Sequence, residues 1–366
     1  TYRCIIKWSW RFIMSEFKIT SITNRDGSHG PQICGIVTFT GSGLTLPNGT
    51  LAGPRGKAIF CGGYSPSIVN TIDTVEIATT GNAVDFGDLP RVTSDCGAFA
   101  SATRGFTAGG FSPSYLSAID FVVFSSGGGG NTFGDMTERT WGINCCANST
   151  RGILMGGRAH TSDNPYNGGY MDRILFLEMA SGGQDTNSFG DLLSYSQLGL
   201  PQGQTGTLTG ATYASSTRGI VAGGGSPRTK FIQYVTIATK GNAQLFGELN
   251  LEASRVTGFS SPTRGVSAGG FNNTPSATKT VVMEYVTIAT LGNATDFGDL
   301  SVARYSPGSG SSTTRGVISG GNTQPGFTNT LDYVTTATTG NATDFGDMTQ
   351  ARMNIGSSDA HGGLAQ

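Results

Sequence analysis

The chain has 366 residues, of which 57 are glycine and only 13% are charged. Soluble domains usually contain ~7% glycine and ~25% charged residues, so this chain turns often and has a polar but mostly uncharged surface. Its net charge is −1 and its lysines and arginines never cluster, so neither a nucleic-acid groove nor a basic membrane face is indicated. No apolar run approaches the ~18 residues that span a bilayer.

The first 53 residues lie outside the pattern that fills the rest of the chain. Residues 1–13 contain Trp8, Trp10 and Phe12 among basic residues and precede a plausible start at Met14. Their apolar core is short and broken and no A-x-A site follows, so we interpret them as translated upstream sequence or a fragment edge. Residues 14–53 contain strand-like runs at 33–39 and 44–51. We expect a short β extension that docks the protein onto a larger assembly or packs as a plug.

From residue 54 to residue 366, one short unit recurs six times. Each copy starts with a T-R-G-like element, continues through a Gly-Gly pair and a β-rich stretch, and ends in Phe-Gly-acid. The arginines are Arg55, Arg104, Arg151, Arg218, Arg264 and Arg315, and the phenylalanines are Phe86, Phe133, Phe189, Phe246, Phe297 and Phe345. Self-similarity at ~40–50 residues is typical of β-propeller blades.

Each copy is predicted to supply four strands, a to d, because short runs of Thr, Val, Ile and aromatic residues alternate with turn residues. In the second copy these are 96–100, 105–108, 119–124 and a short piece at 133–135. Strand a has small residues, which fits an innermost place where blades converge. A last a-like segment at 353–360 can pair with the first b strand at 57–61 and remove the open sheet edge. We therefore predict an all-β, six-bladed β-propeller, with a truncated seven-bladed ring as the alternative.

The repeat resembles two groups of proteins. The Gly-Gly after a strand, the aromatic residue on the last strand and an arginine before the next copy resemble kelch repeats, although phenylalanine replaces the usual tryptophan. These arginines are Arg91, Arg139, Arg255, Arg304 and Arg352. Two parts of the sequence are similar to repeat proteins of marine tailed bacteriophages: the repeat motif Y-V-T-I-A-T-x-G-N-A-T-D-F-G-D-L and the segment 19–36. That resemblance implies a virion or tail-associated protein.

Motifs that suggest catalysis are better explained by the fold. Asp-Phe-Gly occurs at Asp85, Asp296 and Asp344, whereas a kinase needs it once and together with other elements. We interpret its phenylalanine as core between blades. Only three histidines are present, in unrelated contexts, which argues against a copper oxidase and against Ser-His-Asp or Cys-His hydrolases. We predict no enzymatic activity, no cofactor and no metal site. The six cysteines lack CxxC pairing and are interpreted as small core residues.

The third copy departs from the repeat, and this departure indicates a binding face. Between Arg151 and Arg218 lie 67 positions, against 46 to 51 for the other copies, and the excess falls at 158–170 and 194–212. These are b–c and d–a connections, which emerge on the same face of a blade, and insertions often mark the binding face. Aromatic and amide side chains there suit glycan or protein recognition. The candidate binding residues are Tyr64, Phe111, Tyr115, Arg158, His160, Asp163, Asn164, Tyr166, Asn167, Tyr170, Phe271, Asn272 and Phe327.

Together these features favour a phage virion propeller that binds a host-surface glycan or protein through its b–c/d–a face. Its expected partners are that host ligand and, through residues 14–53, other virion proteins. Its expected location is the phage particle, after synthesis in the bacterial cytoplasm. One alternative is a structural component that decorates or cements the virion. Another is a polysaccharide-degrading enzyme that uses carboxylates alone.

Overall fold

The computed structural model describes residues 56–163, 169–194, 196–199, 207–225, 228–272 and 278–364, together with two short strands before them. The chain divides into two units, residues 1–54 and 55–366. In the first unit β1 (Leu44–Thr45) pairs antiparallel with β2 (Leu51–Ala52). The predicted strand at 33–39 and the segment 1–13 lie outside the described residues.

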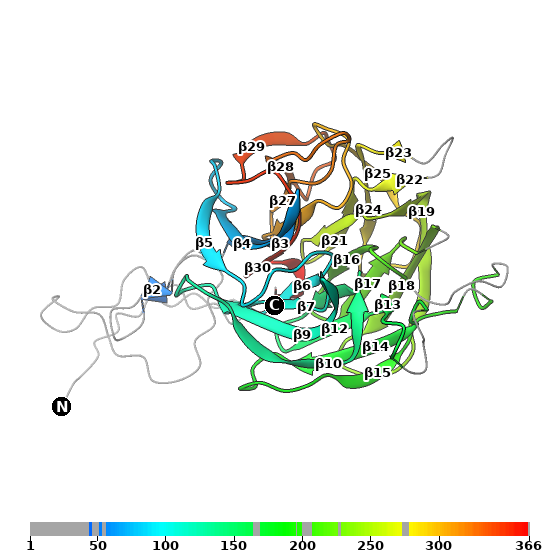
Figure 1. The fold of residues 1–366 in the computed structure, drawn as a ribbon. Helices are drawn as coiled ribbons and strands as arrows, with labels where there is room; N and C mark the ends of the chain where they lie inside the picture. The colour runs from blue at the N-terminus through cyan, green and yellow to red at the C-terminus, as the bar shows by residue number, and fades with distance from the viewer. Residues whose placement is uncertain are drawn as a thin grey trace, which may run out of the picture. The chain divides into compact units, whose positions relative to one another are not determined.

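The second unit is a six-bladed β-propeller, as the repeat count predicts (Figure 1). Every blade is an antiparallel sheet of four strands ordered a-b-c-d, with strand a innermost. From a to d, blade 1 is β30 (Met353–Ser358), β3 (Lys57–Ser65), β4 (Ser67–Glu76) and β5 (Val84–Asp88). Blade 2 is β6 (Gly97–Ala100), β7 (Arg104–Ala108), β9 (Ser114–Val123) and β10 (Asn131–Trp141), with β8 (Phe111–Ser112) beside β9. Blade 3 is β11 (Asn144–Ala147), β12 (Arg151–Met155), β14 (Arg173–Glu178) and β15 (Asn187–Asp191).

The remaining blades follow the same order. Blade 4 is β16 (Ala211–Ala214), β17 (Arg218–Ala222), β18 (Thr229–Thr236) and β19 (Gln244–Ser254). Blade 5 is β20 (Thr257–Ser260), β21 (Arg264–Ala268), β24 (Val282–Thr287) and β25 (Thr295–Asp299). Blade 6 is β26 (Gly308–Ser311), β27 (Arg315–Ser319), β28 (Thr330–Thr335) and β29 (Thr343–Asp347). A 3-10 helix, η1 (Gly362–Leu364), follows β30.

Blade 1 closes the ring by joining strands from both ends of the repeat region. β30 pairs with β3, with Ala58 opposite Ser358 and Cys61 opposite Ile355. The Asp359 carboxylate accepts hydrogen bonds from the backbone N–H groups of Gly56 at 2.7 Å and Lys57 at 2.9 Å. The predicted closure is therefore confirmed, and the ring has six blades, not the seven of the alternative.

Two outer strands are longer than predicted. The repeat predicts that every d strand is a short Phe-Gly-acid piece, but β10 and β19 each have 11 residues. Their extensions pair with short strands from the b–c loop of the next blade: β13 (Arg158–Ala159) and β22 (Phe271–Asn272), the latter followed by β23 (Thr278–Lys279). The extra length therefore depends on a neighbouring loop, which the local sequence does not reveal.

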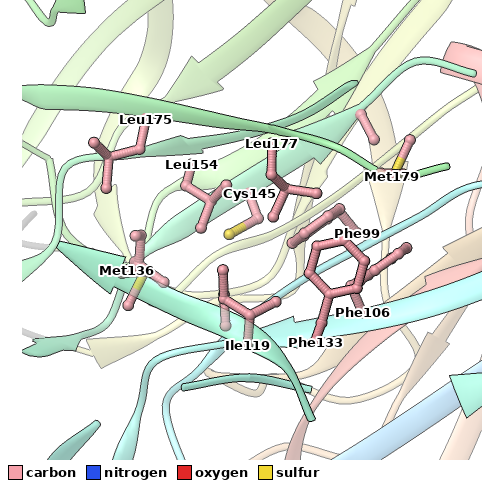
Figure 2. Close-up of a cluster of buried hydrophobic side chains, with 13 residues drawn as sticks. Phe99, Phe106, Ile119, Phe133, Met136, Cys145, Leu154, Leu175, Leu177 and Met179 are labelled. Atoms are coloured by element: carbon pink, nitrogen blue, oxygen red, sulfur yellow. The ribbon is translucent and has the colours of Figure 1, made fainter. Parts of the chain in front are cut away.

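Apolar side chains fill the space between adjacent blades. In the cluster between blades 2 and 3, Phe99 stacks on Phe106 with ring centroids 5.0 Å apart, and Phe133 meets Phe106 edge to face at 5.3 Å (Figure 2). Leu154 and Leu177 face them from blade 3. The d-strand phenylalanines are buried in all six blades, which confirms their predicted place in the core.

The cysteines of the propeller belong to the same apolar interior. Cys61, Cys96, Cys145 and Cys146 are free and buried, as expected for small core residues. Burial raises the pKa values of Cys96 and Cys146 to about 12, so both remain neutral thiols. Cys4 and Cys34 lie outside the described residues.

A clasp made of backbone hydrogen bonds covers the outer edge of each blade. At the junction of blades 5 and 6, Gly340 N–H donates to Phe297 O at 2.7 Å and Ala342 N–H donates to Asp299 O at 2.8 Å. The Asn341 side chain accepts from Asp299 N–H at 3.0 Å. The Gly-Asn-Ala segment of one blade thus pairs with the Phe-Gly-acid strand of the preceding blade. Equivalent carbonyls of Phe86, Asp135, Phe189, Phe246 and Phe345 are satisfied in the same way at the other junctions.

The clasp explains why glycine follows the phenylalanine. A Cβ at Gly298 would lie 2.4 Å from Gly340 O, and its backbone φ of +140° is one that other residues rarely adopt. Gly346 has the same geometry against Gly81 O, at 2.5 Å. Glycine is therefore required where two backbones approach this closely.

We expect Gly298→Ala to weaken the junction of blades 5 and 6. Moving the Gly340 carbonyl away should lower the free energy of unfolding by about 1–3 kcal/mol. Gly182→Ala is the matched control, because a Cβ there meets no atom within 4 Å. Urea unfolding of the two variants beside the wild type measures the difference. Equal stability of Gly298→Ala and wild type would contradict the steric account.

Candidate functional site

A central channel runs along the axis of the propeller between the six inner strands. It encloses a cavity of about 130 Å³, lined by residues from every blade. Serine hydroxyls join the inner strands around it: Ser358 donates to Ser311 O at 2.7 Å, Ser311 to Ser260 O at 2.8 Å, and Ser260 to Ala214 O at 2.9 Å. Pockets for drug-sized ligands usually measure ~300–1,000 Å³, so the channel is too small to enclose a ligand of that size.

The residues after β30 close one end of the channel. His361 lines the cavity and η1 packs against the ends of the inner strands β11, β16 and β20. The His361 Nε2–H donates to Ala100 O at 2.9 Å, and its Nδ1 accepts from Gly363 N–H at 3.2 Å. This tautomer is neutral. Burial lowers the pKa of His361 from 6.5 to about 4, while the bond to Ala100 opposes the shift.

The other end of the channel, on the b–c/d–a face, carries a ring of strained backbone. Asp95, Thr209, Arg255 and Ser306 have φ values of 49°, 52°, 56° and 50°, each directly before or near an inner strand. Backbone hydrogen bonds link neighbouring positions, as from Thr209 N–H to Gly142 O at 3.1 Å and from Ser306 N–H to Arg255 O at 2.8 Å. Left-handed non-glycine residues are uncommon and concentrate at functional sites.

Arg255 spans the mouth of the channel. It precedes the inner strand of blade 5, and its Nη1 lies 3.3 Å from the carboxylate of Asp95, which precedes the inner strand of the opposite blade 2. The guanidinium lies over two rings, 5.7 Å from the centroid of Trp141 and 5.9 Å from that of Tyr305. We call Asp95, Trp141, Arg255 and Tyr305 the mouth cluster.

Further rings extend the mouth cluster across the face. On one side Tyr115 stacks on Trp141 with centroids 6.5 Å apart, and His160 meets Tyr115 at 5.5 Å. On the other side Phe271 meets Tyr305 at 4.9 Å, and Arg228 lies over Phe271 at 5.1 Å. A band of partly exposed rings and two arginines therefore crosses the b–c/d–a face from blade 2 to blade 5.

The structure brings some of the candidate binding residues to this band and separates others from it. Tyr115, His160 and Phe271 belong to the band, and Phe111 packs on Tyr115 at 6.2 Å. Tyr64 pairs with Phe327 at 5.8 Å, and Arg158 lies over Tyr170 at 5.9 Å. Asn164, Tyr166 and Asn167 lie outside the described residues.

Two of the candidate residues, one ion-paired and one buried, are not free groups on the surface. Asp163 accepts from Arg139 N–H and pairs with the Arg139 guanidinium, both at 2.7 Å, which ties down the start of the 158–170 loop. Burial alone would raise the pKa of Asp163, but the hydrogen bonds and charge of Arg139 lower it overall. Asn272 is only 9% exposed and faces a small cavity between blades 4 and 5.

The sequence prediction did not include the mouth cluster. Arg255 is grouped there with the arginines before each new copy, but it lies nine residues after its d-strand phenylalanine, whereas Arg304 and Arg352 lie seven residues after theirs. That difference moves Arg255 from the blade interior to the channel mouth. The number of residues between the d-strand phenylalanine and the arginine therefore distinguishes Arg255 from Arg304 and Arg352 in the sequence alone.

Comparisons of the chain with models of known protein families and with curated proteins give no match. Among the described residues, no three or more His, Cys, Asp or Glu side chains are grouped as ligands for a metal ion. That same part of the chain contains no helix with the length and apolar character needed to cross a membrane.

The neutral state of His361 should make stability depend on pH. Its folded pKa lies below its unfolded value, so its stabilising contribution is complete above pH 6.5 and is lost as the pH falls towards 4. We expect His361→Gln to flatten the fall in unfolding free energy between these values by on the order of 2 kcal/mol. Urea unfolding at pH 7, 5.5 and 4 measures this, with His160→Gln as the control. An unchanged pH profile in His361→Gln would refute the assignment.

Proposed function

We propose that this protein is a non-enzymatic recognition module of a phage virion, which binds a host-surface ligand through the b–c/d–a face of its propeller. The observation that carries the proposal is the mouth cluster. At the positions equivalent to Arg255 and Asp95, other blades have Gly142, Thr209 and Ser306. Charged and aromatic side chains are therefore specific additions on this face, and no repeat contact requires them.

The opposite face is occupied by contacts that maintain the ring. There the arginine that begins strand b in each of blades 2 to 6 stacks on its own strand-c ring and donates to carbonyls of the next blade. Arg264, for example, lies 4.5 Å from the Tyr285 centroid and donates to Ala337 O at 2.8 Å. The same arrangement occurs at Arg104, Arg151, Arg218 and Arg315. Divergence at one face and repetition at the other favour the b–c/d–a face for recognition.

The chemistry of the mouth cluster favours a glycan over a protein as the host ligand. Partly exposed tryptophan and tyrosine rings stack on the apolar faces of sugars, while arginine and aspartate pair with hydroxyl groups. The ligand would lie across the mouth, because the channel behind it is smaller than the ~300–1,000 Å³ pockets that enclose drug-sized ligands. The virion role is supported by the resemblance of the repeat wording and of residues 19–36 to phage repeat proteins.

We expect replacement of the mouth cluster to abolish binding while the propeller stays folded. Trp141→Ala and Arg255→Ala each remove stacking and charge from a partly exposed position, and each should lower affinity for host cells at least about tenfold. Binding of the labelled protein to host cells, and its competition by purified host polysaccharide, measures this. Leu291→Ser, at an exposed c–d turn on the opposite face, is the control.

Wild-type binding by both mouth variants would exclude this site. Loss of binding in Leu291→Ser but not in the mouth variants would place recognition on the opposite face. Binding that protease treatment of the cells removes and polysaccharide does not compete would identify a protein ligand instead of a glycan.

A further inference from the structure

One position in each blade lies at the junction with the following blade. It lies seven residues after the d-strand phenylalanine in every blade except blade 3, where an insertion delays it, and its carbonyl accepts from the second glycine of the Gly-Gly pair. In blade order the residues are Thr93, Thr140, Thr207, Ala253, Arg304 and Arg352. Arg304 and Arg352 are completely buried, so each places its guanidinium group inside the junction between two blades.

The guanidinium of Arg304 has defined acceptors in blade 6. It donates to Gly320 O at 3.1 Å and to Thr330 O at 2.9 Å, and it pairs with the buried Asp332 carboxylate. Arg352 pairs in the same way with Asp73 of blade 1, at 3.0 Å. A buried carboxylate on strand c is therefore matched by one positive charge from the preceding blade.

The junction of blades 4 and 5 has the acceptors without the arginine. The residues equivalent to the three acceptors of Arg304 are Gly269, Val282 and Glu284, while the residue equivalent to Arg304 is Ala253. These four residues line a cavity of about 10 Å³. That volume is about one water-sized sphere, so the space where a guanidinium lies at the next junction holds a single small species.

Glu284 is buried in this cavity without a positive partner among the described residues. It is 6% exposed, and Asn250 N–H donates to its Oε1 at 3.0 Å. Burial raises the pKa of Glu284, as expected for a carboxylate that has lost solvent and gained no cation. At the junction of blades 1 and 2, where Thr93 also leaves room, Arg91 reaches Asp120 instead, at 2.9 Å.

A second buried group faces the same cavity. The Asn272 Oδ1 is buried and has no hydrogen-bond partner within the described part of the chain. The Ser267 side chain also lines the cavity. A buried amide oxygen without a donor is costly, so a species that it can coordinate is expected beside it.

We propose that this cavity is a binding site for a small monovalent cation such as Na⁺, which occupies the place of the missing guanidinium. Its oxygen ligands are the Glu284 carboxylate, the Asn272 amide oxygen and the backbone carbonyls that line the cavity. Oxygen donors suit a hard cation, and a single carboxylate balances a single charge, as at the arginine-containing junctions. The size of the cavity excludes larger organic cations.

The experiment compares thermal unfolding in NaCl and in tetramethylammonium chloride at equal ionic strength and pH 8. We expect Na⁺ to raise the Tm of the wild-type protein by a few degrees, about 2–5 °C, in a saturable manner. Glu284→Gln removes the charged ligand and Ala253→Arg fills the cavity with a guanidinium, so both should lose the difference between the salts. Glu76→Gln, at an exposed strand-c carboxylate, should retain it.

The ²³Na NMR linewidth in the presence of protein gives an independent readout. Broadening by wild type and Glu76→Gln, but not by Glu284→Gln, supports the site even if Ala253→Arg fails to fold. Identical melting of the wild type in both salts, with no specific broadening, would overturn the proposal. It would mean that the cavity holds no cation.

Discussion

The clasp between each Phe-Gly-acid strand and the Gly-Asn-Ala segment of the next blade is the contact on which this propeller depends. A four-stranded blade alone would expose the polar edge of strand d, and such an edge recruits other chains. Here the next blade supplies N–H groups to that edge, as Gly340 and Ala342 do for Phe297 and Asp299. Because blade 1 supplies the same N–H groups to strand d of blade 6, the clasp covers strand d at every junction of the ring.

The clasp also accounts for the composition of the chain. Glycine is needed on the Phe-Gly-acid side of the junction, since a Cβ at Gly298 would lie 2.4 Å from Gly340 O. The repeat motif G-N-A-T-D-F-G-D therefore contains both halves of the clasp. Its Gly-Asn-Ala segment contacts the preceding blade, and its Phe-Gly-Asp segment contacts the following blade. Sequence periodicity revealed the number of blades and the closing strand, because both follow from counting. It did not reveal the clasp, because a periodic pattern does not show whether a residue contacts its own repeat or the next one.

The same limit applies to the candidate site. The choice of the b–c/d–a face rested on the topology of an up-and-down blade, which alternation of short strands makes predictable. The side chains that meet at the channel mouth were not predictable in this way, because Trp141 and Arg255 come from blades 2 and 4 in sequence and converge only when the ring closes. Tyr115 and His160 are predicted from sequence as loop residues of the face, yet the packing of His160 on Tyr115 beside Trp141 depends on β13 adding to the neighbouring blade.

The blade junctions show how a repeat can vary internally while its clasps stay constant. The residue at each junction varies together with the equivalent strand-c residue of the next blade: Thr140 accompanies Leu175, Thr207 accompanies Gln233, and the two arginines accompany Asp332 and Asp73. A strand-c carboxylate is thus paired with an arginine, either from this position or, for Asp120, from Arg91, and an uncharged strand-c residue accompanies a threonine. Such pairing is expected when an unmatched buried charge costs several kcal/mol, about as much as the whole margin of stability that many domains have.

Among the described junctions, Ala253 and Glu284 are the pair that departs from this rule. The departure lies beside the base of the b–c loop that carries Phe271, a ring of the band at the channel mouth. The β22 strand that positions Phe271 also directs Asn272 into the junction cavity. Two adjacent residues of one short strand therefore line the junction cavity and the proposed recognition face. A shift of Asn272 in the cavity would move Phe271 on the surface.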